Sequence, residues 1–278
     1  MGDPLDDGTA GDERGSGLPR ETVDDVLARL PRELAGSRAK VERARKHLDE
    51  LHVAIEAIDP TQFYRMVRDD DADAGVSTWR FRILRELPDV WGVVIGEFGY
   101  QLRSSLDLAV HQLAVADSGA PGRKTAFPIF SDAQNYAGQR PTYLEGVHEA
   151  HWAIFDTLQP YLRGNAPFAD LAWLTNTDQH QLLHPSFVMV GEQDLEFEIH
   201  AASPPFEEVT FGAPGQLLHD GAQMVYARSL GGLPRMNVKT RVTLDVAFGE
   251  RGLQWGHIDT IGGRAVEALD DIGRLFKA

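Results

Sequence analysis

The chain has 278 residues, no cysteine and a formal net charge of −15. The absence of cysteine excludes disulfide bonds, thiolate metal sites and cysteine nucleophiles, and no apolar run approaches the roughly 20 residues of a membrane span. Residues 1–19 hold five acidic residues and one arginine, so −11 of the charge belongs to the remainder. A body this acidic argues against broad DNA binding, which depends on Lys and Arg neutralising phosphates.

The first part of the chain is predicted to be helical. Residues 1–19 are rich in Gly, Asp and Pro, show no secretory signal, and are expected to form a disordered acidic tail. The region 20–185 is expected to hold helices, with a hairpin at about 62–86 where "DDADAG" separates two runs rich in β-branched and aromatic residues. Periodicity predicts its helices at 21–30, 32–58, 88–117, 142–158 and 168–184.

The character of the chain changes after Pro185. Short alternating runs, separated by Gly, Pro and Asp-Gly turns, predict antiparallel strands, the clearest of them at 237–248. A closing helix is expected at 258–277, so 186–278 forms an antiparallel region that packs with the helices as one unit. The predicted fold class is α+β: a helical bundle with an inserted hairpin, then a small antiparallel sheet and a C-terminal helix. Four aromatic residues are expected in the core: Trp79, Phe81, Trp91 and Trp173.

The stretch "GEFGYQLRSSLDLAVHQLA", residues 96–114, predicts a helix with a narrow polar stripe. At 100° per residue, its polar side chains fall within an arc of about 120°. The polar stripe consists of Glu97, Tyr100, Arg103, Ser104, Asp107 and His111. Arg103, Asp107 and His111 are four residues apart, so Asp107 could hold Arg103 and orient His111 for acid–base chemistry. The alternative is a solvated helix face with weak ion pairs.

Several motifs together resemble an uncharacterised bacterial family. They are "GEFGYQLRSSLDLAVHQLA", "FPIF", "LQPY" and "LTNTDQHQLL", and they cover roughly residues 62–184. The family pattern has Gly-Asp before Leu-Arg-Ser-x-Leu-Asp-His, and later Asn-x-Asp-Lys-His-Arg. Its Arg-x4-His core is similar to the motif of HEPN domains, helical bundles that often cleave RNA without a metal and commonly pair two subunits.

The resemblance implies a HEPN-like helical core, an RNA or nucleotide ligand and a homodimer. The chain departs from the family pattern at Leu108, which stands where the family has histidine, and His111 is the nearest histidine to Arg103. Glu97 replaces the family's Asp. "DQHQ" keeps Asp178 and His180 but lacks both basic residues of the family motif, which weakens the expectation of phosphate binding.

A metal site is an alternative for the segment "NTDQHQLLHP". His180 and His184 are four residues apart, and on a helix they could ligate zinc or iron together with Glu97 or other stripe residues. The competing interpretation is a helix end at which histidines interact favourably with the helix dipole. The spacing in "HEAHW" does not fit a zinc-protease motif, and phosphate-loop, dinucleotide-binding and nucleophile-elbow motifs are missing.

The sequence therefore predicts a cytoplasmic HEPN-like protein with a polar pocket for a nucleotide, an RNA end or another small anionic ligand, and with no required cofactor. Arg103, Asp107 and His111 are the expected catalytic residues, with Arg103 contacting the anion. Ligand contacts are expected from Glu97, Tyr100, Ser104, Asp178 and His180. A metal-dependent enzyme and a noncatalytic interaction module are the alternatives, and the module is favoured if Arg103 and Asp107 are buried and paired with each other.

Overall fold

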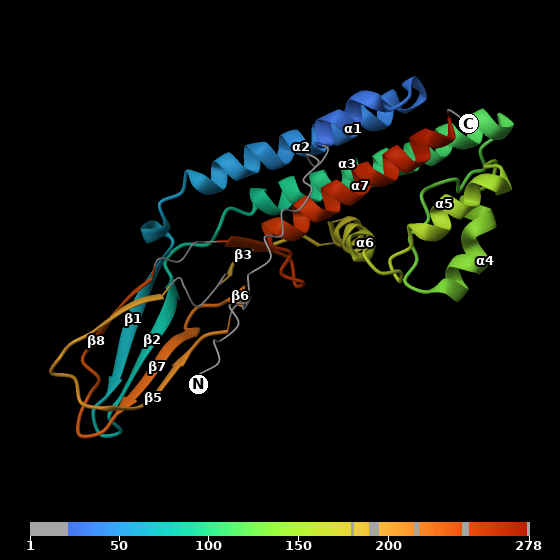
Figure 1. Cartoon of the computed structure of the whole chain (residues 1–278). Helices are drawn as coiled ribbons and strands as arrows, with labels where there is room; N and C mark the ends of the chain where they lie inside the picture. Colours follow the sequence, from blue (N-terminus) through green and yellow to red (C-terminus); the bar gives the residue numbers. More distant parts are fainter. Residues whose placement is uncertain (1–21, 179–180, 189–194, 214–216, 241–244, 277–278) are drawn as a thin grey trace, which may run out of the picture.

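A computed structural model describes residues 22–178, 181–188, 195–213, 217–240 and 245–276. Helices occupy one end of an elongated molecule and antiparallel strands the other (Figure 1). This arrangement confirms the predicted α+β fold class. The predicted tail at 1–19 lies outside the described residues.

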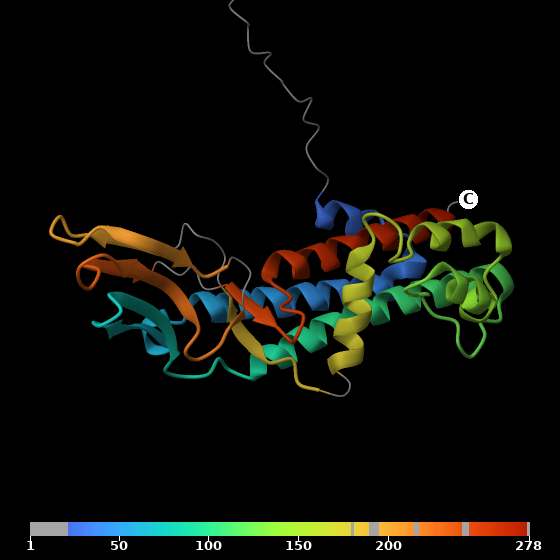
Figure 2. The same ribbon diagram turned by 90° about the horizontal axis from the view of Figure 1, so that it is seen from below.

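Helices that run side by side form the main bundle (Figures 1 and 2). They are α1 (Val23–Arg29), α2 (Ala35–Glu56), α3 (Val90–Ser118) and α7 (Trp255–Leu275). The single-turn helices η1 (Arg32–Leu34) and η2 (Pro60–Gln62) precede and follow α2. α3 is central, because α2, α6 and α7 all pack against it and its apolar face is fully buried. Among the described helices, none has the length and apolar content needed to cross a membrane.

In the middle of the chain, the structure differs from two predicted helices. The structure has α4 (Ala133–Tyr143), η3 (Glu149–His151) and α5 (Trp152–Thr157), so the predicted helix at 142–158 is wrong. Gly146 breaks it, with a φ of +89° that a helix does not use. α6 (Ala166–Asp178) ends before the predicted limit at residue 184, and His184, which precedes Pro185, stands at a position that disfavours helical backbone.

The described strands form three antiparallel sheets. The largest has the order β1–β2–β7–β5, and the others are β6–β3–β9 and β4–β8. Their bounds are β1 (Tyr64–Asp71), β2 (Val76–Ile83), β3 (Pro185–Val188), β4 (Leu195–Ile199), β5 (Phe206–Phe211), β6 (Leu217–Leu218), β7 (Gln223–Ser229), β8 (Met236–Thr240) and β9 (Asp245–Phe248).

The predicted hairpin at 62–86 is present as β1 and β2, which pair from Tyr64–Ile83 to Asp71–Val76. It belongs to the same sheet as β7 and β5 and is not an isolated insertion in the helical region. The single strand expected at 237–248 is instead divided between β8 and β9, which pair with different partners. Period-two alternation identified both segments but could not show that they join separate sheets.

Aromatic side chains connect the sheets in one continuous core. The ring of Phe81 lies 4.8 Å from that of Tyr64 and 5.6 Å from that of Phe187, measured between ring centroids. Phe187 is in β3, so this cluster joins the largest sheet to the three-stranded one. Trp79, Phe81 and Trp91 are buried as predicted, whereas Trp173 is only partly buried.

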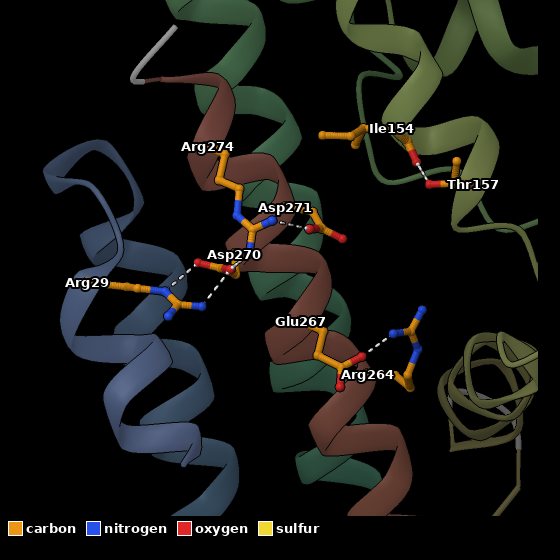
Figure 3. A network of polar contacts seen from close by, with 8 residues as sticks. All are labelled: Arg29, Ile154, Thr157, Arg264, Glu267, Asp270, Asp271 and Arg274. Atoms are coloured by element: carbon orange, nitrogen blue, oxygen red, sulfur yellow. Dashed lines mark hydrogen bonds and ion pairs between the residues drawn. The ribbon is translucent and has the colours of Figure 1, made fainter. Parts of the chain in front are cut away.

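A buried carboxylate connects the first and last helices of the bundle. Asp270 of α7 accepts hydrogen bonds from Arg29 Nε at 2.8 Å and Nη2 at 2.7 Å, and from Arg274 Nη2 at 2.6 Å (Figure 3). The hydrogen bonds from Arg29 lower the pKa of Asp270, and those from Arg274 add to this effect, against the opposing effect of burial. The carboxylate therefore holds α1 against α7 in its ionised form.

We expect Asp270→Asn to lower the free energy of unfolding by about 1–3 kcal/mol, because it weakens charge-assisted bonds to two arginines. Asp271→Asn is the matched control. The Asp271 carboxylate makes a longer contact, 3.6 Å, with the exposed Arg274, and burial raises its pKa, in contrast to the lowered pKa of Asp270. Urea denaturation of both variants measures the difference. Equal losses in the two variants would contradict the role assigned to Asp270.

The same contact predicts a pH dependence. The folded pKa of Asp270 is lowered, so its stabilising contribution is complete above the unfolded pKa of about 3.9 and is lost as the pH falls through the folded value. The stability difference between the wild-type protein and Asp270→Asn should be constant near pH 7 and shrink below about pH 4. Denaturation midpoints measured at several pH values check this, and a difference that grows in acid would contradict it.

Candidate functional site

Arg103 and Asp107 of the polar stripe form a clamp on a loop. Arg103 Nε donates to Asp107 Oδ2 at 3.2 Å, and Arg103 Nη2 donates to the Phe127 carbonyl at 2.7 Å. The Phe127 N–H donates to Asp107 Oδ1 at 2.9 Å. The side chains are 22% and 34% exposed, so the pair is partly shielded from water. Both backbone polar groups of Phe127 are thus satisfied by one ion pair on α3.

The loop that carries Phe127 is also held from its other side. Gln159, fully buried, donates to the carbonyls of Pro128 and Phe155 and accepts from the Phe130 N–H. Asn165 in turn donates to the Gln159 carbonyl and accepts from Arg264 of α7. The sequence motifs "LRSSLD", "FPIF" and "LQPY", together with Asn165, therefore meet in one hydrogen-bonded network. Within that network, the motif residues support packing.

His111 is placed differently from the prediction that Asp107 orients it. His111 is exposed, and within the described part of the chain it makes no hydrogen bond or ion pair. Both Asp107 oxygens are instead engaged by Arg103 and Phe127. Tyr100 is 57% exposed, and Ser104 is partly exposed. These three side chains therefore face solvent next to the clamp.

The amino-terminal end of the stripe, around Glu97, lies near both α6 and α2. A Cβ atom on Gly96 would lie 1.9 Å from Asp178 Oδ1, so the carboxyl group rests directly on the α3 backbone. Burial and, to a lesser extent, the negative charge of Glu97 raise the pKa of Asp178. Glu97 Oε2 lies 3.4 Å from Nδ1 of the buried His47 on α2. The structure thus brings Glu97 and Asp178 together, away from the clamp.

Leu108, which stands where the resembled motif pattern has histidine, faces α2. A Cβ atom on Gly36 would lie 2.8 Å from Leu108 Cδ2, so the side chain packs where α2 begins. On α3, five residues separate it from Arg103, which corresponds to a rotation of about 140°. A leucine here fills the interface between two helices and is consistent with a packing role.

The metal site considered as an alternative does not assemble in the described residues, which contain no group of three or more suitable ligands. His184 lies beyond the end of α6, with its Nδ1 3.4 Å from Asp89 Oδ1 next to the first turn of α3. Glu97 is eight residues further along α3, a distance of about 12 Å at 1.5 Å per residue. The predicted i, i+4 pairing of His180 and His184 on one helix is wrong for His184, and His180 lies outside the described residues.

A cavity of about 520 Å³ opens between α6 and the three-stranded sheet. We call it the α6–sheet cavity. The carboxyl-terminal half of α6, the segment before and into β3, β6 and the turn after β9 all contribute to its wall. Its lining residues are Trp173, Asn176, Thr177, Gln181, Leu182, His184, Ser186, Leu217, Gly249 and Glu250. Six of these ten lie in "WLTNTDQHQLLHP", but Leu217, Gly249 and Glu250 are distant in sequence and carry no motif.

An arginine borders this cavity. The Arg251 guanidinium lies 5.1 Å from the centroid of the Trp173 ring, and its Nη1 is 3.2 Å from Asp170 Oδ1. A Cβ atom on Gly249 would lie 2.5 Å from the Trp173 ring, and Gly249 has a φ of +64°. Glycine at 249 therefore allows the turn that carries Glu250 and Arg251 to approach α6.

A second recess, of about 660 Å³, lies at the sheet end and includes Arg68, His200 and Arg235. Arg68 is already bound to Asp70, Ser77 and two backbone carbonyls, and it lies over the Trp79 ring. Most of the remaining wall comes from Gly, Ala, Pro, Leu and Met residues. The α6–sheet cavity combines an aromatic wall with convergent polar side chains and is the stronger candidate site.

Comparisons with protein-family models, with curated proteins and with solved structures gave no match to this chain.

We expect Asp107→Ala to reduce the free energy of unfolding by about 1–3 kcal/mol, because it leaves Arg103 and the Phe127 N–H without their acceptor. His111→Ala, four residues along the same face, should change stability by less than about 0.5 kcal/mol. Urea denaturation gives both values, and faster amide exchange at Phe127 should accompany the loss in Asp107→Ala. Unchanged exchange at Phe127 would contradict the clamp.

Proposed function

We propose that this protein is a noncatalytic binding module that holds a small molecule in the α6–sheet cavity. The observation that carries the proposal is the cavity itself. Its volume of about 520 Å³ lies within the roughly 300–1,000 Å³ of small-molecule sites, and amide, hydroxyl, imidazole and carboxyl groups converge beside an aromatic wall, as in such sites.

The contacts of the polar stripe support a binding module over an acid–base enzyme. Arg103 is neutralised by Asp107 and hydrogen-bonded to the Phe127 carbonyl, which makes it a weak anion contact. His111 has no orienting carboxylate in the described part of the chain. General acid–base catalysis needs a positioned group of this kind. The HEPN-like likeness, RNA contact, a homodimer and a cytoplasmic location stay predictions.

A cavity-filling variant tests the proposal. We expect Thr177→Trp to place an indole in the cavity and abolish ligand binding, because Thr177 lines the cavity and is only partly buried. Ala166→Trp is the matched control, because Ala166 is exposed at the opposite end of the same helix. Binding of a mixed-charge fragment library, observed by ligand NMR, is compared among the wild-type protein and both variants.

The proposal predicts fragments that bind the wild-type protein and Ala166→Trp but not Thr177→Trp. Circular dichroism and thermal melting confirm that each variant is folded before the comparison. The proposal fails if no fragment binds the wild-type protein, or if folded Thr177→Trp binds the same fragments with unchanged affinity.

A further inference from the structure

We infer that the α6–sheet cavity selects a small organic cation: an ammonium group carried on a ring or a short apolar chain. The inference rests on the proposed function and adds the chemical class of the ligand. It reverses the sign expected from the sequence, where Arg103 was the predicted contact for an anion.

The first argument is the charge of the wall. Glu250 lines the cavity and has no ion-pair partner among the described residues. No lysine or arginine is among the described lining residues. Glu250 therefore supplies a negative charge that the wall itself does not compensate.

The groups that can carry positive charge in and beside the cavity wall, His184 and Arg251, are already paired. Arg251 lies over Trp173 and is bound to Asp170 at 3.2 Å, so its positive charge is matched by a neighbouring carboxylate. The imidazole of His184 lies beside the carboxylate of Asp89. A protonated His184 is balanced by Asp89, and a neutral one adds no positive charge. Neither pair offsets Glu250.

The end of α6 adds to the negative potential. Thr177 lines the cavity from the last turn of α6, which ends at Asp178. The helix dipole places partial negative charge at this end and favours cations, although the Thr177 carbonyl itself accepts a hydrogen bond from the Gln181 N–H at 2.7 Å. The net charge of −15 further attracts cations to the molecule.

The rest of the wall determines what carries the ammonium group. Trp173, Leu182 and Leu217 provide apolar surface, while Asn176, Thr177, Gln181 and Ser186 offer oxygen acceptors. An ammonium group donates up to three hydrogen bonds and accepts none, which fits these acceptors. A primary amine attached to an aromatic ring satisfies both parts of the wall and fits the volume.

Three probes that share an indole ring and differ in charge test the inference: tryptamine, tryptophol and indole-3-acetate. Isothermal titration at low salt, with the full-length protein, measures each affinity. We expect tryptamine to bind about tenfold more tightly than indole-3-acetate, with tryptophol between them, because Glu250 attracts the ammonium group and repels the carboxylate.

Substitution of the carboxylate isolates the cause of the preference. Glu250→Gln should weaken tryptamine binding about three- to fivefold, as expected for an exposed ion pair, and leave tryptophol unchanged. Glu208→Gln, an exposed glutamate of β5 in another sheet, is the control for the change in total charge.

The outcomes separate this inference from the proposed function. The cation preference is overturned if indole-3-acetate binds as tightly as tryptamine or more tightly, if only tryptophol binds, or if none of the three probes binds. It is also overturned if Glu250→Gln and Glu208→Gln lose equal tryptamine affinity. In all these cases the binding module stands if Thr177→Trp still blocks fragments that bind the wild-type protein.

Discussion

The contact on which the helical end depends is the ion pair between Arg103 and Asp107, with the Phe127 backbone held between the two side chains. A loop that runs against a helix must satisfy its own N–H and carbonyl groups. Here one arginine and one aspartate on a single helix satisfy both groups of one loop residue. Gln159 satisfies the next part of the same loop. Polar residues whose spacing on the helix suggests a catalytic site therefore anchor a loop instead.

Much of the fold could be predicted because its signals are local. The "DDADAG" junction between two runs rich in β-branched and aromatic residues identified β1 and β2, and the apolar period of residues 88–117 identified α3. The failures come from long-range contacts. The helix expected over 142–158 is broken at Gly146, whose left-handed backbone is settled by packing near Ala120 and Ala114. The hairpin joins a sheet with β7, about 150 residues away, which no local pattern encodes.

The same distinction between local and long-range contacts decides what could be predicted of the site. The four-residue spacing correctly predicted that Arg103 and Asp107 touch, because that contact is fixed by helix geometry. It could not show that the second partner is the Phe127 backbone, so that the two Asp107 oxygens are engaged by Arg103 and Phe127 while His111 is exposed. Glu250 was missed because nothing in "GERG" marks it. It lines the cavity only because the turn after β9 packs against Trp173.

The glycines of α3 link this packing to the cavity. A Cβ atom on Gly92, Gly96 or Gly99 would lie 1.8, 1.9 or 2.6 Å from Leu183, Asp178 or Leu174, respectively. Glycine spaced along one face lets the Leu183 backbone and the Asp178 and Leu174 side chains approach the α3 backbone closely. These contacts hold α6 and the segment before β3 against α3. Since Asn176, Thr177 and His184 belong to this segment, the side of the cavity that they form is set by the absence of side chains on α3.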